Sequence, residues 1–195
     1  LTNTVNLIDG LDGLAAGVST IASITIMLVA LQEDVMIVAL FTAALAGAAL
    51  GFLRYNFNPA KIFMGDTGSM FLGFILAGIS VIGAVKCTAT IALIVPILAL
   101  GLPIMDTTFA IIRRYRGGVP IFKPDKGHLH HRLLDLGFSQ RQAVLLMYVI
   151  SALLGLSAVA LNEVSGGMSI VIVVCVLLVV FLGARKLGIF RLKTN

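Results

Sequence analysis

The run Leu14-Ala-Ala-Gly-Val-Ser-Thr-Ile-Ala-Ser-Ile-Thr-Ile-Met-Leu-Val-Ala-Leu31 contains no charged side chain. An α-helix needs about 20 apolar residues to cross the hydrocarbon core of a bilayer. Because lipid offers no hydrogen-bond partner to the backbone, a helix is the form that satisfies every backbone group of such a segment. The run therefore predicts a transmembrane helix, and its recurrence along the chain decides the fold class.

Five further apolar segments follow the same pattern. They span Val35–Leu53, Met70–Val85, Ala89–Ile112, Gln142–Leu161 and Met168–Ala184. Hydrophobic residues make up 59% of the 195 residues and charged residues 12%, a balance that excludes a soluble globular domain. Pro96, Gly101 and Pro103 predict a kink or break within the fourth of the six segments. We predict an all-α integral membrane protein, a polytopic bundle of about six transmembrane helices that forms one domain over residues 1–195.

The polar connections between these segments are unevenly charged. Of the 14 Lys and Arg residues, all except Lys86 fall on one side of the predicted bundle. The positive-inside rule makes that side cytoplasmic, so the sequence pI of 9.6 indicates orientation and an affinity for anionic lipid, not nucleic-acid binding. We predict a multi-pass protein of the plasma membrane whose catalytic loops face the cytoplasm. Cys87 and Cys175 match no metal or redox spacing, and we interpret both as packing residues.

One cytoplasmic stretch, Asn58-Pro-Ala-Lys-Ile-Phe-Met-Gly-Asp-Thr-Gly-Ser69, combines an acid with glycines between two apolar segments. The glycines on either side of Asp66 let backbone N–H groups approach a ligand, and the small neighbours suit a carboxylate that reaches a metal. Thr67 and Ser69 are expected to cap the next helix, whose N-terminus would favour a phosphate. The alternative is a helix cap and tight turn without chemistry.

The first cytoplasmic piece repeats polar residues every three positions, among them Asn6, Asp9 and Asp12. On a helix these three side chains would share one broad face, whereas Gly10 and Gly13 favour a helix–loop junction equally well. Two carboxylates this close repel each other, which favours a bound cation or a raised pKa in one of them. The alternative is a solvated turn that leads into a membrane span.

All three histidines of the sequence lie in the cluster His128-x-His130-His131. A zinc site is one interpretation, but no cysteine accompanies the cluster. Contact with phosphate is the other, and we prefer it slightly because Lys126 and Arg132 lie beside the histidines.

Three further residues are candidates. Asp106 lies in the last third of the fourth apolar segment, where an acid is expected to be functional or paired. Arg113 or Arg114 would be its partner in a structural ion pair. Asn56 and Phe63 would suit a planar polar ring held between an amide and an aromatic face, or else they are loop residues at the membrane interface.

The motifs Asn6-x-x-Asp9-Gly-x-Asp12-Gly, Pro59-Ala-Lys-x-Phe-Met-Gly-Asp66-Thr-Gly-Ser and His128-x-His130-His131 occur in this order on predicted cytoplasmic loops. In combination they are specific, and the sequence resembles the polyprenyl-phosphate N-acetylhexosamine-1-phosphate transferase family over nearly its whole length. The run Asp125-Lys-Gly-His-Leu-His-His-Arg-Leu-Leu134 resembles the branch that transfers GlcNAc-1-phosphate to undecaprenyl phosphate. The related phospho-MurNAc-pentapeptide translocases tend to carry three adjacent histidines instead.

The resemblance implies that a UDP-sugar gives its sugar-1-phosphate to undecaprenyl phosphate in the bilayer and releases UMP, to start a lipid-linked cell-envelope glycan. It also implies Mg²⁺, with Mn²⁺ as the alternative ion, at the pyrophosphate. Asn6 and Asp66 would hold the metal. The resemblance further places Asp9 and Asp12 on the catalytic side. It implies that the uracil ring would be contacted by Gly10, Leu11, Asn56 and Phe63. Phosphate or sugar would be contacted by Lys126, His128, His130, His131 and Arg132.

The sequence departs from this family in one respect. Family members also carry an adjacent Asp pair on an earlier cytoplasmic loop, and this sequence has no Asp-Asp and no starting Met. We therefore expect that an amino-terminal part with that loop and several spans precedes Leu1, and that this chain needs it for activity. No cleavable signal peptide is visible.

Other functions remain open at this point. The sister enzyme that transfers phospho-MurNAc-pentapeptide is disfavoured by the histidine spacing. A transporter with an ion site at the bilayer midplane is disfavoured because the spans hold almost no acid apart from Asp106. A zinc-dependent membrane hydrolase would be recognised by tightly bound zinc. A homodimer is one assembly that the sequence leaves open.

Overall fold

The computed structural model describes residues 1–86, 89–116, 118, 127–164 and 167–186. Within these ranges the chain forms α-helices and no β-strand, which confirms the all-α class. The helices are α1 (Thr2–Ile8), α2 (Leu14–Gln32), α3 (Met36–Asn56), α4 (Gly65–Lys86), α5 (Ala89–Ala99), α6 (Gly101–Arg116), α7 (Leu129–Asp135), α8 (Gln140–Glu163) and α9 (Gly167–Lys186).

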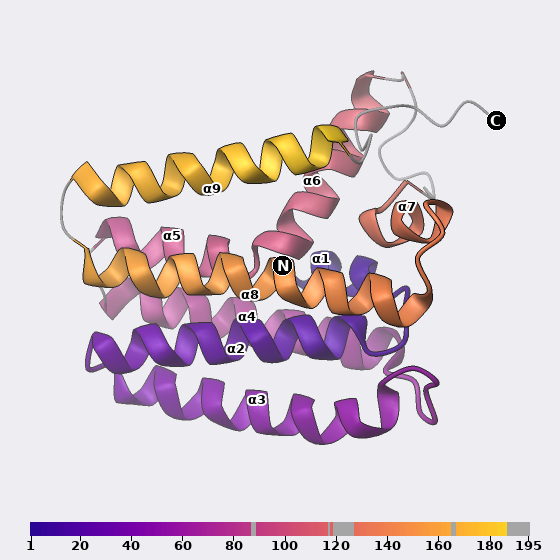
Figure 1. Ribbon diagram of the computed structural model, residues 1–195. Helices are drawn as coiled ribbons and strands as arrows, with labels where there is room; N and C mark the ends of the chain where they lie inside the picture. The colour runs from indigo at the N-terminus through magenta and orange to yellow at the C-terminus, as the bar shows by residue number, and fades with distance from the viewer. Residues whose placement is uncertain (87–88, 117, 119–126, 165–166, 187–195) are drawn as a thin grey trace.

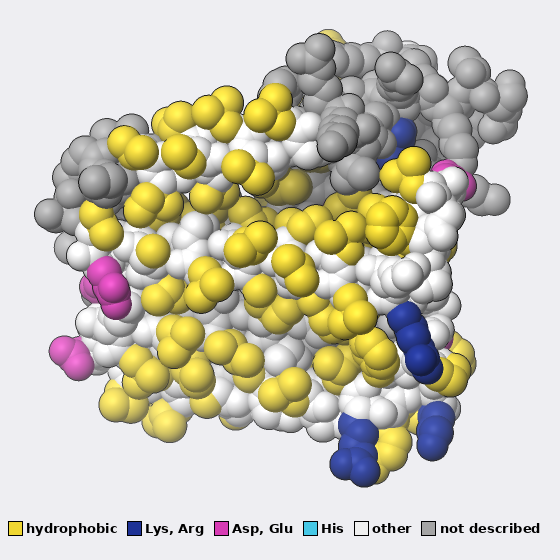
Figure 2. Space-filling model, viewed as in Figure 1, with side chains coloured by type: hydrophobic (Ala, Val, Ile, Leu, Met, Phe, Trp, Pro, Cys, Tyr) yellow, Lys and Arg dark blue, Asp and Glu magenta, His cyan; other side chains and the backbone are white. Residues whose placement is uncertain are grey.

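Four of these helices are long and apolar enough to cross a membrane: α2, α3, α4 and α8. α2 lies at the centre, packed between α3 and α8 (Figure 1). Its inner faces carry small residues such as Ala15, Ala16 and Ala22, all fully buried, and small side chains let neighbouring helices approach closely. The outer helices instead expose large apolar side chains, as the space-filling view shows (Figure 2). The result is a polytopic membrane bundle.

The fourth predicted segment is broken, as its prolines and glycine indicated. α5 ends at Ala99 and α6 begins at Gly101, and α6 leaves the common direction of the bundle (Figure 1). Pro96 lies inside α5, whereas Pro103 lies in the first turn of α6, where its missing N–H is not needed. This segment is therefore two helices that meet at Leu100 and not one continuous span.

One end of the bundle gathers the polar elements. α1, α7 and the loop between α3 and α4 all lie there (Figure 1). On the face drawn in Figure 2, Lys and Arg side chains gather at this same end, while acidic side chains lie mainly at the opposite end. This separation of charge agrees with the predicted orientation, in which the basic end faces the cytoplasm.

Candidate active site

The contact between α1 and α4 brings the first two motifs together. It depends on Gly73, because a Cβ atom there would lie 2.8 Å from Thr2 Cα. With α1 this close, Asn6 Nδ2 donates hydrogen bonds to Asp66 Oδ1 at 3.0 Å and to Ser69 Oγ at 2.9 Å. Asp66 is exposed in the first turn of α4. The two predicted metal-site residues are therefore neighbours, although 60 positions separate them in the sequence.

The start of α4 differs from its predicted position. Thr67 and Ser69 were expected to cap the helix, but α4 begins at Gly65, whose φ of 66° lies in the left-handed region. Both residues therefore lie inside the first turns, and Ser69 Oγ donates to the Gly65 carbonyl at 2.9 Å. A glycine adopts positive φ without steric cost, and the helix starts before both of the predicted capping residues.

Asp9 follows α1 directly, so the helix–loop junction is the form that the structure adopts. Burial raises the pKa of the Asp9 carboxyl, and the charge of Asp66 nearby raises it further. A raised pKa in one acid of this motif was one of the two expected outcomes, but its causes are burial and Asp66 and not the repulsion between Asp9 and Asp12 on which that expectation was based. The carboxylates of Asp9 and Asp66 are hard oxygen donors of the kind that fits Mg²⁺. Asn6 faces Asp66 with its Nδ2 group, so it would bind the ion only with its Oδ1 turned towards it. Among the described residues no group of three or more His, Cys, Asp or Glu forms a metal cage, so substrate oxygens and water would complete the coordination.

Asp12 ties the first loop to the loop between α3 and α4. Its Oδ2 accepts hydrogen bonds from Asn58 Nδ2 at 3.0 Å and from the Ala60 backbone N–H at 3.1 Å. Arg141 at the start of α8 donates from Nε to the Asn58 carbonyl at 2.9 Å. The position of Asp12 is thus fixed by the loop that leads to Asp66, and its role on the catalytic side stays a prediction.

Asn56 is almost completely buried and uses both ends of its amide. Its Oδ1 accepts from the Gly13 N–H at 3.0 Å, and its Nδ2 donates to the Ile62 carbonyl at 2.9 Å. The residue therefore joins two loops, and its contact with uracil stays a prediction. Phe63 is 77% exposed beside it and is accessible to a ligand ring.

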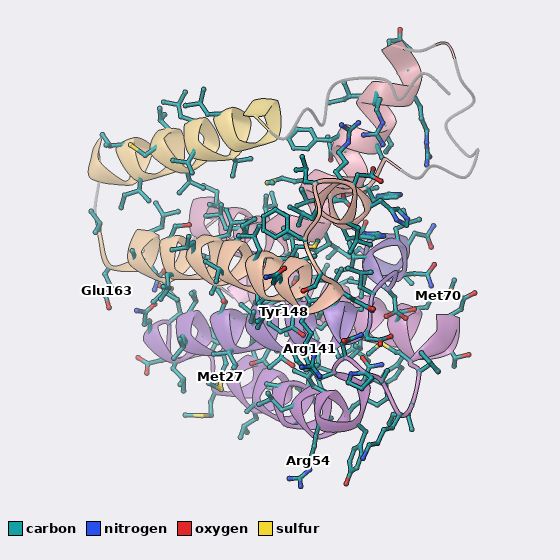
Figure 3. All side chains as sticks on the ribbon, turned by 45° about the vertical axis from the view of Figure 1, so that its right-hand side comes forward. Met27, Arg54, Met70, Arg141, Tyr148 and Glu163 are labelled. Carbon is teal, nitrogen blue, oxygen red and sulfur yellow. The ribbon has the colours of Figure 1, made fainter. Side chains whose placement is uncertain are left out.

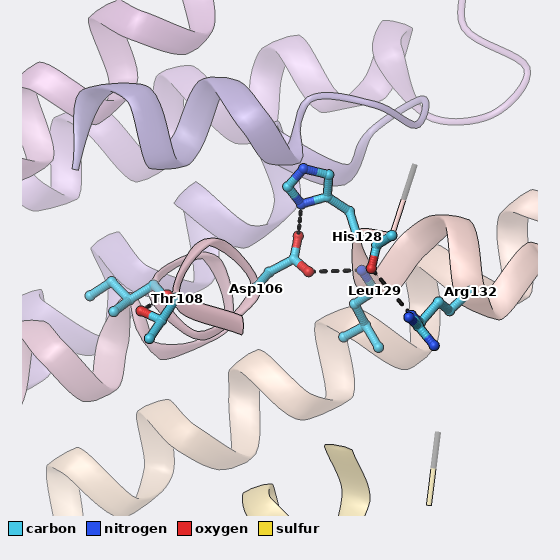
Figure 4. Close-up of polar contacts among 7 residues, drawn as sticks. Asp106, Thr108, His128, Leu129 and Arg132 are labelled. Atoms are coloured by element: carbon cyan, nitrogen blue, oxygen red, sulfur yellow. Dashed lines mark hydrogen bonds and ion pairs between the residues drawn. The ribbon is translucent and has the colours of Figure 1, made fainter. Parts of the chain in front are cut away.

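The histidine cluster is held by α7. His128 precedes this helix, and its Nδ1 lies 2.9 Å from Asp106 Oδ2 on α6, while Asp106 Oδ1 accepts the Leu129 N–H at 2.7 Å (Figure 4). The partner that the structure gives to Asp106 is therefore a histidine 22 positions away. No sequence pattern had pointed to this pair.

His130 connects this cluster to the loop after α1 that carries Asp9 and Asp12, here called the acidic loop. It is 1% exposed, its ring stacks on that of His128 with centroids 5.9 Å apart, and the His131 ring lies 4.2 Å away. A Cβ atom on Gly10 would lie 2.6 Å from His130 Nε2, so only a glycine lets the ring lie this close to the loop. Burial lowers the pKa of His130 to about 4, with His131 as the next cause. His130 is thus a neutral side chain near pH 7.

The remaining predicted residues are placed as follows. Arg132 is partly buried and donates from Nε to the Gly127 carbonyl at 3.3 Å, and Leu11 is partly buried in the loop before α2. Lys126 lies outside the described residues. Tyr148 was missed: from α8 its hydroxyl donates to the Gly13 carbonyl at 2.5 Å (Figure 3). Its only signal was a polar aromatic residue within an apolar run.

The fold and this cluster define a class: a polytopic α-helical membrane protein with an acidic and histidine-rich site on loops at one end. A family model described as glycosyl transferase family 4 matches residues 1–84. The chain is 44% identical over 193 residues to a probable undecaprenyl-phosphate N-acetylglucosaminyl 1-phosphate transferase of Bacillus subtilis (strain 168), which covers 99% of this chain and 54% of that protein. These matches are consistent with the family that the motifs suggested.

Two other relatives represent two branches of the family. A decaprenyl-phosphate N-acetylglucosaminephosphotransferase of Mycobacterium tuberculosis (strain ATCC 25618 / H37Rv) is 42% identical over 168 residues, 76% of this chain and 42% of that protein. A phospho-N-acetylmuramoyl-pentapeptide-transferase of Rubrobacter xylanophilus is 36% identical over 152 residues, 77% of this chain and 44% of that protein. The chain spans about half the length of the curated relatives that it matches.

Proposed function

We propose that the protein carrying this chain is a membrane phosphoglycosyl transferase, which moves GlcNAc-1-phosphate from UDP-GlcNAc to undecaprenyl phosphate and releases UMP. One observation carries the proposal: Asn6, Asp9 and Asp66 meet beside the histidine helix α7 at the basic end of a membrane bundle. Acids that bind a hard cation, next to basic groups that bind phosphate, are the parts that phosphoryl transfer needs. The names of the relatives support the same reaction and donor.

Asp66 and Asn6 are the residues that would hold Mg²⁺ in this proposal. The ion would neutralise charge on the donor pyrophosphate as UMP leaves. Asp66 suits this role because it is exposed and Asn6 orients its carboxylate. Asp9 lies close enough to Asp66 for the two charges to interact. In this proposal it would therefore help to orient the pyrophosphate oxygens of the donor.

A cavity beside the histidine helix supports a site for the acceptor lipid in this proposal. A cavity of about 430 Å³ lies between α6, α8 and α9, and its lining is almost entirely apolar, including Met105, Leu154 and Val176. Leu129, the residue after His128, lines it as well. A hydrocarbon chain in this cavity would therefore end close to the histidine helix, where Arg132 and His131 would meet its phosphate.

The experiment that tests this proposal measures UMP release by the purified full-length protein with undecaprenyl phosphate in detergent or nanodiscs. UDP-GlcNAc should support release, and UDP-MurNAc-pentapeptide should not. Release with the second donor alone would assign the protein to the sister branch. Failure of both donors, together with stoichiometric bound zinc, would favour a membrane hydrolase instead.

Asp66→Asn is the sharpest variant, because it keeps the shape of the side chain but removes the negative charge that a hard cation needs. We expect turnover to fall by several orders of magnitude while the protein still folds. Without substrate, Mg²⁺ should raise the melting temperature of the wild type, since a ligand that binds only the folded state stabilises it. The variant should lose this shift.

Asp34→Asn is the matched control, because Asp34 is exposed in the turn between α2 and α3, at the opposite end of the bundle. It should keep both turnover and the magnesium shift. Near-normal turnover of Asp66→Asn would refute the metal role. That outcome would leave Asp66 as an acid in the first turn of α4, where its charge only favours the helix N-terminus.

A further inference from the structure

Asp106 is a buried acid on α6 that belongs to none of the sequence motifs. Only 5% of its surface is exposed, and both carboxylate oxygens have a partner. Oδ2 lies 2.9 Å from His128 Nδ1, and Oδ1 accepts the backbone N–H of Leu129 at 2.7 Å (Figure 4). One side chain therefore fixes both the ring of His128 and the first residue of α7.

The pairing decides which nitrogen of His128 carries the proton. An ionised carboxylate only accepts hydrogen bonds, so the imidazole nitrogen that faces it has to donate. In the neutral ring this places the hydrogen on Nδ1 and leaves Nε2 with a free lone pair. The other nitrogen of the ring thereby becomes a hydrogen-bond acceptor.

We infer that Asp106 is the positioning residue of the histidine cluster: it holds His128 as the Nδ1–H tautomer and presents Nε2 as an acceptor to the substrate. The substrate group that matches this atom is a hydroxyl or a protonated phosphate oxygen. The inference rests on the proposed function for the reaction, but the tautomer itself does not depend on it.

The same contact places the rest of the cluster. His130 stacks on the His128 ring with an angle of 5° between the ring planes, and it lies against Gly10 of the acidic loop. Rotation of His128 would therefore disturb the stack that joins α7 to this loop. Asp106 therefore acts on the site indirectly, by holding the ring of His128 in position.

Asp106→Asn separates this role from simple helix capping. The asparagine keeps the size of the side chain and an oxygen that accepts the Leu129 N–H, so α7 should remain in place. Its NH₂ group would donate to His128 Nδ1 and force the proton onto Nε2, which then no longer accepts. The same substitution in the Ser-His-Asp triad leaves the geometry intact and lowers kcat about 10⁴-fold through the wrong tautomer.

The first measurement is ¹⁵N NMR of histidine-labelled, full-length protein near pH 7 without substrate, with the His128 signals assigned by their loss in His128→Gln. The wild type should show a protonated Nδ1 and an unprotonated Nε2, and Asp106→Asn should show the reverse. A wild-type ring protonated on Nε2 alone would overturn the inference. Because no turnover is needed, this result stands whether or not the proposed reaction is the right one.

The second measurement is UMP release. We expect Asp106→Asn to lower kcat by about 100-fold or more with a melting temperature near that of the wild type, and Asp106→Glu to recover part of it. In a His128→Gln background, Asp106→Asn should cause no further loss, since residues that act as one unit are not additive. Full additivity, or a normal kcat in Asp106→Asn, would reduce Asp106 to a structural residue that only caps α7.

Discussion

His130 is a histidine that the folded protein keeps neutral. Burial lowers its pKa to about 4, whereas an unfolded histidine titrates near 6.5. Between these two values the unfolded chain binds a proton that the folded protein does not, so stability is present above pH 6.5 and falls as the pH falls towards 4. At most about 3 kcal/mol is lost in this window, at about 1.4 kcal/mol per pKa unit.

This residue yields a prediction on pH dependence. The wild-type melting temperature should fall by several degrees between pH 7 and pH 4.5. In His130→Gln the melting temperature should depend less on pH over this range, because the contribution of this histidine is removed. Thermal melting of both proteins in the same detergent over this pH range checks it. Parallel curves for the two proteins would show that His130 is accessible and titrates normally.

At the scale of helices, the candidate active site depends on how closely α1 approaches α4. Gly73 faces the backbone of Thr2, where a Cβ atom would lie 2.8 Å from its Cα and 3.0 Å from the Leu1 carbonyl oxygen. Backbone atoms cannot rotate out of the way as a side chain does, so any larger residue has to push the helices apart. The hydrogen bond between Asn6 and Asp66 would be lost with that movement.

Gly73→Ala should therefore lower the stability by about 1–3 kcal/mol, the usual cost of overpacking, and reduce turnover. Gly78→Ala on the same helix is the control, because nothing lies within 4 Å of a Cβ atom there; a glycine replaced inside a helix should gain about 0.5–1 kcal/mol. Denaturation and UMP release of the two variants check this. Equal effects at both positions would refute the close contact.

Most of the helices could be predicted from the sequence, whereas the contacts between them could not. Long apolar runs predicted α2, α3, α4, α8 and α9, and prolines predicted the break between α5 and α6, because both signals are local. The pairing of Asp106 with His128 depends on the direction of α6 after that break, which no local pattern encodes. The start of α4 was misplaced as well: the helix begins at Gly65, with a positive φ, before the residues that the capping pattern indicated.

The candidate site was predicted in its residues more than in their geometry. Asn6 and Asp66 were matched by motif, and the structure places them in direct contact. Asn56 was predicted to contact uracil or to be a loop residue; its amide joins two loops in the structure, and the contact with uracil stays a prediction. Tyr148 was missed because a single tyrosine in an apolar helix looks like any other packing residue.

At the scale of the whole molecule, the separation of charge in Figure 2 predicts one orientation in the membrane. Lys61, in the loop between α3 and α4, and Glu163, at the end of α8, are both exposed. In a full-length protein without other cysteines, Lys61→Cys should react only from the cytoplasmic side and Glu163→Cys only from the outside.

An impermeant thiol reagent applied to intact cells and to inverted vesicles checks this orientation. UMP release by both cysteine variants is the control for correct folding. Labelling of both positions from the same side would contradict the topology, and with it the shared cytoplasmic site of the acidic and histidine loops.

The hydrogen bonds of Asp12 and Asn56 have a consequence for how a substrate is received. Three bonds join the turn before α2 to the end of α3 and the loop that follows it, and a fourth, from Asn56 Nδ2 to the Ile62 carbonyl, holds that loop to the end of α3. The two segments therefore have little freedom to move separately. Ordering a loop when a ligand arrives subtracts from the binding free energy. Here that loss of conformational entropy occurs during folding. A nucleotide bound as we propose would therefore meet a site that is already ordered, and its affinity would not be reduced by the cost of ordering these loops.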